Sequence, residues 1–346
     1  MKAMFLTDLR QMELREIPEP AIEKDTDVLL KIEAAGVCGS DVHYYETGRI
    51  GSQVVEYPFV VGHECAASVA DIGTAVNHVK IGDPVAVEPS FSCHNCDQCK
   101  ADREHTCRNV SFLGTPGQAS GCMCEYIVVP QENCIKTNGA ISHEQGAFCE
   151  PLSIGIYSVK QADFVKGASI AILGTGPIGL CVLTASKEYN AGRTYVTDKI
   201  DSRLEAAGKL GIEYAGNPDK TDIVEEILAV EPLGVDCVLE CCGQQDALDQ
   251  ALDILKPGGS LVIVGIPRDD LIHFSADKFR RKEITIKYIR RQNKCVQPAI
   301  DLIASGRVNT DLLITHRFSL EQAQSAFDLL TRYGDNVIKA MISGKS

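Results

Sequence analysis

Long apolar runs and an excess of basic charge are both missing from this sequence of 346 residues. No apolar run approaches the roughly 20 residues that a membrane-spanning helix needs, which argues against a helical membrane protein. Asp and Glu outnumber Lys and Arg by 47 to 34, so the net charge is −13. This balance argues against nucleic acid or an anionic membrane surface as a partner, and it favours a soluble enzyme.

A secretory signal is also missing, because residues 1–20 contain no apolar segment of the signal-peptide type. We therefore expect a cytoplasmic protein whose thiols are reduced. Its 15 cysteines then indicate metal ligands and ordinary buried thiols. The sequence contains neither internal repeats nor low-complexity segments.

Four of the cysteines lie in one short segment with the spacing Cys-x2-Cys-x2-Cys-x7-Cys, formed by Cys93, Cys96, Cys99 and Cys107. Four thiolates at this spacing fit a closed tetrahedral site for one structural zinc ion. The alternative is a disulfide framework, which requires an oxidising compartment. The pattern therefore predicts a structural zinc site. Ten other cysteines lack ligand spacing and are expected to pack as small hydrophobic side chains: Cys65, Cys122, Cys124, Cys134, Cys149, Cys181, Cys237, Cys241, Cys242 and Cys295.

The length suggests two domains, and the pattern changes near residue 150. Before that point, short strands are broken by Gly, Pro and Asp, which is typical of an irregular, mostly antiparallel β domain. The strands expected there are residues 27–34, 66–72, 83–87 and 126–129.

From about residue 168 to 289, strands alternate with helices, which predicts a doubly wound parallel sheet. The expected strands are 169–173, 194–197, 236–240 and 261–265, with helices at 177–189 and 202–210 and a turn at 257–259. The basic cluster from Lys278 to Lys294 is expected to be a strand, 283–289, with charged flanks. Two helical stretches and a final strand at 337–342 follow and are expected to fold back onto the first domain.

The predicted fold class is therefore α/β, with an irregular β-rich domain and a doubly wound parallel sheet. The first domain is expected to comprise residues 1–152, with 290–346 folding back onto it. The second is expected to comprise residues 153–289.

A glycine-rich motif, Gly174-x-Gly176-x-x-Gly179, lies where the strand 169–173 gives way to a helix. In this context the motif predicts a Rossmann dinucleotide site, in which glycines let the backbone approach a pyrophosphate at a helix N-terminus. Asp198 ends the next strand, where a carboxylate accepts hydrogen bonds from ribose and repels a 2′-phosphate, so NAD is favoured over NADP. Asp198 as a solvated strand-end carboxylate and Arg203 as a surface charge remain the alternatives. The expected coenzyme residues are Gly174, Gly176, Pro177, Ile178, Gly179, Asp198, Arg203, Val264, Gly265 and Ile266.

Cys38 and the pair His63-Glu64 carry little information in isolation. A lone cysteine after a glycine usually packs in the interior, and a His-Glu pair in a loop usually lies on the polar surface. Together with the other motifs, however, they resemble the zinc-dependent medium-chain alcohol dehydrogenases from end to end. The motifs that carry this resemblance are residues 36–41, 62–64, the Cys93–Cys107 segment, Glu150-Pro151 and 174–179. Within that family, residues 38–51, 148–153 and 315–318 look like those of the sorbitol (L-iditol), xylitol and related polyol dehydrogenases.

The resemblance implies a GroES-like catalytic domain, a Rossmann domain that binds NAD, and two zinc ions per subunit. Cys38, His63 and Glu64 would hold a catalytic zinc ion. Glu150 would form a hydrogen bond to the zinc-bound water or would itself become a ligand. A mixed S, N and O ligand set with one open position is what a catalytic zinc requires. Zinc would help an alcohol to lose its proton. The catalytic residues implied are Ser40, His43 and Glu150, of which His43 either relays the proton or packs beside the ligands.

The resemblance also implies a substrate pocket lined by Tyr44, Phe112 and Arg291, with the arginine donating to several hydroxyl groups. The family's aromatic residue after that arginine is Gln292 here, and Arg291 could instead be a charge that flanks the last strand of the sheet. The expected function is NAD-dependent oxidation of a polyol to a ketose in a homo-oligomer (a dimer or tetramer) that pairs through the strand 283–289. L-threonine 3-dehydrogenase and butanediol dehydrogenase are the alternative enzymes, and a non-catalytic nucleotide-binding protein is the alternative class.

Overall fold

The computed structural model describes residues 1–267 and 271–343, and these divide into two units. The first unit comprises residues 1–150 and 296–346, and the second comprises residues 151–295. The alternation of a β-rich and an α/β part follows the predicted fold class, and each unit is described separately below. Within the described residues, no helix is long and apolar enough to cross a membrane.

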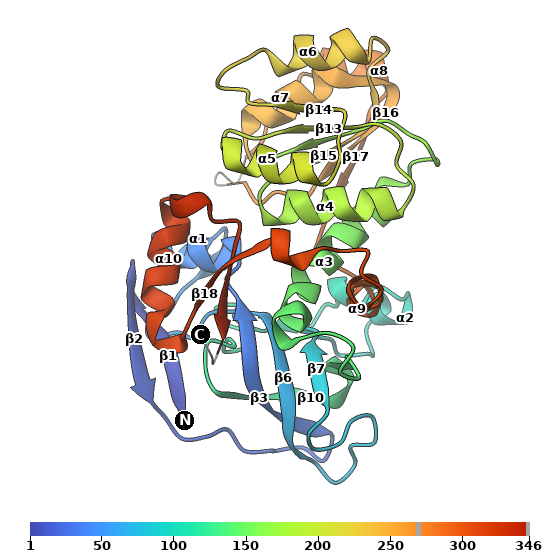
Figure 1. Cartoon of the computed structure of the whole chain (residues 1–346). Helices are drawn as coiled ribbons and strands as arrows, with labels where there is room; N and C mark the ends of the chain where they lie inside the picture. Colours follow the sequence, from blue (N-terminus) through green and yellow to red (C-terminus); the bar gives the residue numbers. More distant parts are fainter. Residues whose placement is uncertain (268–270, 344–346) are drawn as a thin grey trace. The chain divides into compact units, whose positions relative to one another are not determined.

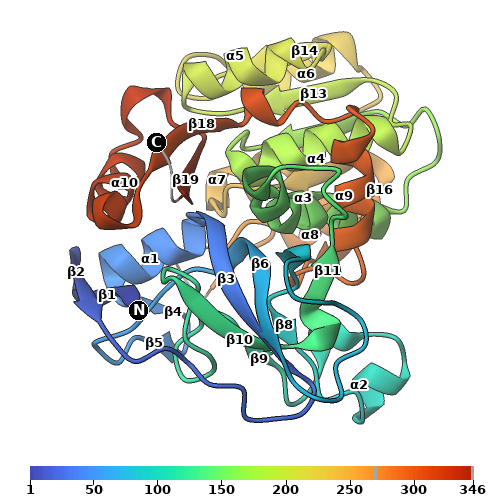
Figure 2. The same ribbon diagram turned by 60° about the horizontal axis from the view of Figure 1, so that its bottom comes forward.

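The first unit is built on a seven-stranded, mostly antiparallel sheet (Figures 1 and 2). Its strands follow the order β11-β7-β6-β3-β19-β18, and β10 also pairs with β3. Their bounds are β3 Asp27–Gly36, β6 Glu64–Ile72, β7 Pro84–Val87, β10 Tyr126–Pro130, β11 Cys134–Lys136, β18 Ile314–Phe318 and β19 Lys339–Ser343. Strands β18 and β19 come from the end of the chain, so the C-terminal segment completes this sheet.

Short hairpins and helices surround this sheet. The hairpins are β1 Lys2–Asp8 with β2 Gln11–Glu16 and β4 Arg49–Ile50 with β5 Gln53–Val54, and a further two-stranded sheet joins β8 Ser90–Phe91 to β9 Ser111–Phe112. The helices are α1 Gly39–Thr47, α2 Asp97–Lys100, α9 Val296–Ala304 and α10 Ala323–Thr331, and helix α3 His143–Ala162 begins in this unit. Short 3-10 helices occupy Glu104–Thr106, Gln131–Asn133, Thr310–Leu312, Leu320–Gln322 and Gly334–Asn336.

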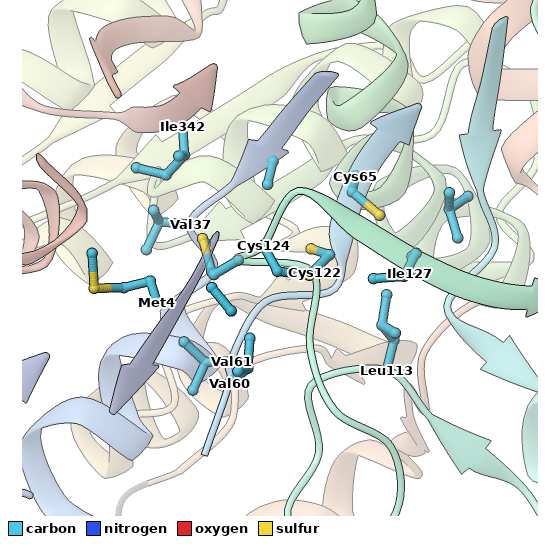
Figure 3. Close-up of a cluster of buried hydrophobic side chains, with 14 of the residues drawn as sticks. Met4, Val37, Val60, Val61, Cys65, Leu113, Cys122, Cys124, Ile127 and Ile342 are labelled. Carbon is cyan, nitrogen blue, oxygen red and sulfur yellow. The ribbon is translucent and has the colours of Figure 1, made fainter. Parts of the chain in front are cut away.

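Buried aliphatic and sulfur-containing side chains form the core of the first unit. Figure 3 shows Cys65, Cys122 and Cys124 among neighbours such as Met4 and Ile127. These thiols pack as small hydrophobic groups, as predicted. Of the ten cysteines expected to do so, eight are buried, but Cys241 is only half-buried and Cys242 is exposed. The packing prediction is therefore wrong for Cys242.

The second unit is a six-stranded parallel sheet with the order β14-β13-β12-β15-β16-β17. Its strands are β12 Ile170–Leu173, β13 Thr194–Thr197, β14 Tyr214–Gly216, β15 Val235–Glu240, β16 Leu255–Ile263 and β17 Thr285–Tyr288. Helices α4 Pro177–Glu188 and α5 Asp201–Lys209 cover one face, and α6 Ile223–Val230, α7 Gln245–Ile254 and α8 Ala276–Lys282 cover the other (Figure 1). This strand order is that of a Rossmann fold, with the reversal of order between β12 and β15.

Two local expectations differ from the structure. The basic cluster begins with helix α8, because Ser275 accepts a hydrogen bond from the Lys278 N–H at 3.4 Å and so caps a helix, and only the later part is the edge strand β17. The turn expected at 257–259 lies inside β16. There Leu255 pairs with Val235 and Ser260 pairs with Cys237, so the residues between them bulge out of the ladder.

Candidate metal sites and coenzyme site

The four-cysteine site (Cys93, Cys96, Cys99 and Cys107) brings four sulfur atoms within 4.8 Å of one another. The sulfur–sulfur distances are 3.6 Å for Cys96 to Cys99, 3.9 Å for Cys96 to Cys107, and 3.4 Å for Cys107 to Cys93. Tetrahedral zinc with bonds of about 2.3 Å separates its sulfur ligands by about 3.8 Å. The donor set therefore fits a structural zinc ion.

Backbone N–H groups stabilise thiolates in this lobe. The Cys93 N–H donates to the Cys107 sulfur at 3.3 Å, and the Asn109 N–H donates to the same sulfur at 3.4 Å. Hydrogen bonds, first from the Asn95 backbone and then from the Cys107 thiol and the Cys96 backbone, lower the pKa of Cys93 to about 6. A low thiol pKa favours the ionised form that binds metal.

The three-ligand site (Cys38, His63 and Glu64) forms where two neighbouring strands place their ends together. Cys38 lies between the end of β3 and the start of α1, and Glu64 begins β6 directly after His63. The register pairs Gly36 with Glu64, so the two segments meet although Cys38 and Glu64 are 26 positions apart in the sequence. One ligand atom from each residue lies within 4.8 Å of the others, and His63 and Glu64 are buried. Three donors of mixed S, N and O type can hold zinc and leave a position open.

Asp41 connects the ligand segments, a role that the sequence patterns did not predict. Its Oδ2 accepts the Cys38 N–H at 3.0 Å, and its Oδ1 accepts the Gly62 N–H at 3.1 Å. The same Oδ1 lies 3.6 Å from His63 Nδ1. This contact favours a proton on Nδ1, which leaves Nε2 as the metal ligand. The Cys-x-x-Asp spacing at the start of α1 could have been recognised as half of a capping box.

The site has an excess of negative groups, which favours a cation. Burial lowers the pKa of His63, but Asp41 and Cys38 outweigh it and hold this pKa above its usual value. Glu150, with 6% of its surface exposed, lies at the end of the first unit. Burial raises the pKa of Glu150 to about 7, with Glu64 and Asp41 adding to the effect and His63 and Lys339 opposing it. Such a carboxyl group can exchange a proton near neutral pH.

Lys339 is a second residue whose role the sequence patterns did not predict. Its Nζ donates to both carboxylate oxygens of Glu64, at 2.8 and 2.7 Å, and both residues are almost fully buried. No pattern near the end of the chain indicates this contact, because it joins strands 275 residues apart.

The other predicted residues of the first unit belong to α1 and β9. Ser40, His43 and Tyr44 are on α1, whose first residue follows Cys38. The Tyr44 hydroxyl donates to Gln53 Oε1 at 3.2 Å. The Phe112 ring lies 5.3 Å from the His63 ring between centroids.

Arg291 belongs to the second unit, and its place in a substrate pocket stays a prediction. It has a left-handed backbone conformation, with φ of 54°, in the segment after β17. The neighbouring Gln292 is buried, and its Oε1 accepts the Cys295 N–H at 2.7 Å. The amide at this position therefore closes a local turn.

The glycine loop of the second unit has the geometry of a dinucleotide site. Gly174 has φ of 95°, and a Cβ on Gly179 would lie 1.8 Å from the Gly174 carbonyl oxygen. No other residue fits either position. Gly176 lies directly before α4, where the first N–H groups of a helix can bind an anion, and Arg203 lies 3.5 Å from the position of a Gly176 Cβ.

Asp198 closes this loop from the end of β13. Its Oδ2 accepts the Thr175 N–H at 2.7 Å, and its Oδ1 accepts the Ile200 N–H at 2.8 Å. Each oxygen retains a second lone pair that can accept a ribose hydroxyl. The predicted residues Val264 and Gly265 follow β16, and their N–H groups donate to the Glu240 carbonyl at 2.8 and 3.0 Å. Ile266 comes next and is 48% exposed.

Comparisons with known proteins find relatives over nearly the whole chain. Residues 24–139 match the model of the alcohol dehydrogenase GroES-like domain, and residues 177–305 match that of the zinc-binding dehydrogenases. The chain is 39% identical to a sorbitol dehydrogenase of Bacillus subtilis (strain 168), over 99% of this chain and 97% of the relative. It is 33% identical to sorbitol dehydrogenase 1 of Saccharomyces cerevisiae, over 99% and 98%. The crystal structure of 2R,3R-butanediol dehydrogenase from Bacillus subtilis superposes with a TM-score of 0.90 at 29% identity, over 99% of both chains.

Proposed function

The chain belongs to the family of zinc-binding alcohol dehydrogenases, and on this premise we propose that it oxidises a secondary alcohol of an open-chain polyol to a ketose, with NAD as hydride acceptor. Near-full-length similarity to sorbitol dehydrogenases supports the polyol class. The observation that carries the chemistry is the convergence of Cys38, His63 and Glu64 within 4.8 Å. This ligand set suits a catalytic metal because it leaves a coordination position for substrate.

The residues of the chain would hold the reactants and move the proton. Zinc, when bound, lowers the pKa of an alcohol by several units, and NAD accepts the hydride. Asp41 fixes the orientation of His63. Glu150, whose pKa is raised to about 7 mainly by burial, can accept and release a proton at neutral pH. Ser40 and His43, half-buried on α1, would pass that proton toward solvent.

The finer points of the proposal are two zinc ions per subunit, a preference for NAD, and a cytoplasmic location. The sulfur separations in the four-cysteine site support the structural zinc ion. Asp198 supports NAD, because a carboxylate at this position repels the 2′-phosphate of NADP.

A substrate panel tests the proposed function. Initial rates would be measured with sorbitol, xylitol, L-threonine, 2,3-butanediol, 2-butanol and ethanol, each with NAD and with NADP. A site that bonds hydroxyl groups rejects analogues that lack them, so we expect kcat/KM for the best polyol to exceed that for 2-butanol by at least about a hundredfold. A higher value for threonine, butanediol or 2-butanol than for every polyol would overturn the polyol assignment.

Arg291 and Arg290 form a matched pair for the substrate pocket. The Arg291→Ala variant should lower kcat/KM for sorbitol far more than for 2-butanol, because only the polyol offers several hydroxyl groups to the guanidinium. Arg290 is exposed, so Arg290→Ala should lower neither value appreciably. If Arg291→Ala lowers kcat/KM equally for sorbitol and 2-butanol, Arg291 does not contact the substrate's hydroxyl groups.

We also propose a homo-oligomer that pairs through β17. Among the described residues, this edge strand pairs with β16 alone, and it presents Tyr288 with 58% of its surface exposed. An exposed edge offers unpaired N–H and C=O groups to a second copy. Light scattering at micromolar concentration should give a dimeric or tetrameric mass, and a monomeric mass would contradict the proposal.

A further inference from the structure

Lys339 is a buried cation in the metal centre, with only 1% of its surface exposed. Its Nζ donates at 2.8 and 2.7 Å to the two oxygens of Glu64 and at 3.0 Å to the Val37 carbonyl oxygen. These three bonds use all three donors of the ammonium group. A fully buried lysine is rare unless it is paired, so the arrangement is a built site for the Glu64 carboxylate.

The strand order explains why this lysine reaches both ligand segments. Strand β3 lies between β6 and β19, and its residue Gly36 pairs with Glu64 on one side and with Met341 on the other. Val37, which accepts from Lys339, directly precedes the ligand Cys38. One side chain from β19 therefore holds a residue adjacent to one ligand and the carboxylate of another.

Gly36 provides the space for this carboxylate. A Cβ at Gly36 would lie 2.1 Å from Glu64 Oε2 and 3.2 Å from Glu64 Cδ. Gly36 does not have a positive φ, so the backbone conformation does not explain the glycine. The absence of a side chain leaves room for Glu64 to turn toward Lys339.

The electrostatic consequences differ between the metal-free and the metal-bound protein. Without metal, Lys339 compensates the buried charge of Glu64, and removing one partner of such a pair is strongly destabilising. With zinc, the ammonium group and the metal attract the same carboxylate and repel each other. The lysine therefore stabilises the empty site and opposes the binding of zinc.

We propose that Lys339 is a positioning residue for Glu64 that preforms the three-ligand site and weakens its zinc affinity by competing for the carboxylate. This inference rests on the proposed catalytic zinc site. It predicts that the metal exchanges more readily than it would at the same three ligands without Lys339, because the Glu64 carboxylate always has a second cationic partner.

The test compares Lys339→Met with the wild type and with the control Lys31→Met. Lys31 pairs with Glu33 on the exposed part of β3, at 3.2 Å and with 52% of its side chain exposed. For each protein, bound zinc would be counted, the Kd of the weaker site would be measured against a chromogenic chelator, and Tm would be recorded with and without zinc at that site.

We expect Lys339→Met to lower Tm without zinc and to bind zinc at the three-ligand site at least about tenfold more tightly, since a neighbouring cation is gone. Its rise in Tm on zinc binding should exceed that of the wild type. Lys31→Met should match the wild type in both respects. The double variant Glu64→Gln with Lys339→Met should recover Tm without zinc, because no unpaired charge remains.

The outcomes separate the two proposals. A wild type that holds zinc in the four-cysteine site alone would overturn the proposed catalytic zinc, and this inference with it. Two zinc ions in the wild type, with unchanged or weaker affinity in Lys339→Met, would overturn the role of Lys339 alone. If Lys339→Met does not fold, Lys339→Gln keeps a donor for Glu64 without the charge, and the same tighter binding is expected.

Discussion

Asp41 is the residue through which the three-ligand site can be perturbed without removing a ligand. It is fully buried, and its two oxygens accept the Cys38 and Gly62 N–H groups while Oδ1 faces His63. In Asp41→Asn one oxygen becomes an NH2 group, so one of the two N–H groups must face a donor. The charge that favours the Nδ1–H form of His63 is lost as well.

Both effects can be given magnitudes. A buried N–H group left without an acceptor costs about 1–3 kcal/mol. For a unit of this size, each kcal/mol corresponds to a shift in Tm of about 2–4 °C, so we expect Tm to fall by about 2–12 °C. Removing an outer partner of a metal-bound histidine reduces metal affinity about 10–100-fold. The zinc Kd of the three-ligand site should rise accordingly.

The assay pairs Asp41→Asn with Asp27→Asn. Asp27 is also a buried aspartate of the first unit, and the Lys24 N–H donates to its Oδ2 at 3.1 Å. An asparagine can keep that bond, so Asp27→Asn should change Tm little and zinc affinity not at all. Chelator competition and thermal unfolding would be recorded for both variants. Zinc affinity in Asp41→Asn equal to that of the wild type would refute the orienting role of Asp41.

Three further outcomes are expected. A chelator should remove zinc from the three-ligand site before the closed four-cysteine site, so that activity disappears while about one zinc ion per chain remains; activity in metal-free protein would contradict the catalytic zinc. Asp198→Ala should weaken the binding of NAD by about 1–3 kcal/mol and allow the enzyme to use NADP. Unchanged KM values for both coenzymes would show that Asp198 does not contact the ribose. Burial raises the pKa of Asp236, but Lys256 and Ser169 outweigh it and hold this pKa below its usual value. The stabilisation by Asp236 should therefore be fully present above about pH 4, the pKa of an aspartate in the unfolded chain, and be lost as the pH falls toward the lower pKa of the folded protein. The difference in Tm between the wild type and Asp236→Asn should shrink on acidification. A constant difference would be inconsistent with this ion pair.

The parallel sheet of the second unit was predictable from its central strands, which are buried. Residues 170–173 and 194–197 are buried, and the first of these strands appears in the sequence as a short continuous apolar run before a turn and a helix. The glycines of the loop were predictable for a related reason, since a close approach of the backbone admits no other residue.

The sequence pattern does not predict helix α8, because it indicates charged flanks of a strand there. The structure gives one of them a specific role. Lys282 Nζ donates to the carbonyl groups of Leu252, Asp253 and Leu255, at 2.7, 2.8 and 2.6 Å, at the C-terminal end of α7. A cation there interacts favourably with the helix dipole. Composition alone does not reveal which carbonyl groups a lysine will reach.

The grouping of Cys38, His63 and Glu64 was predictable through resemblance, whereas the partners of these side chains follow from the strand order. Antiparallel pairing places the end of β3 beside the start of β6, so Cys38 and Glu64 meet with no signal in their spacing. Lys339 joins them only because the last strand of the chain pairs with β3. A sequence pattern is informative where the interacting residues share one element, as Cys38 and Asp41 do at the start of α1. Where three strands converge, the charge that balances a ligand can come from any of them, and the sheet order decides which.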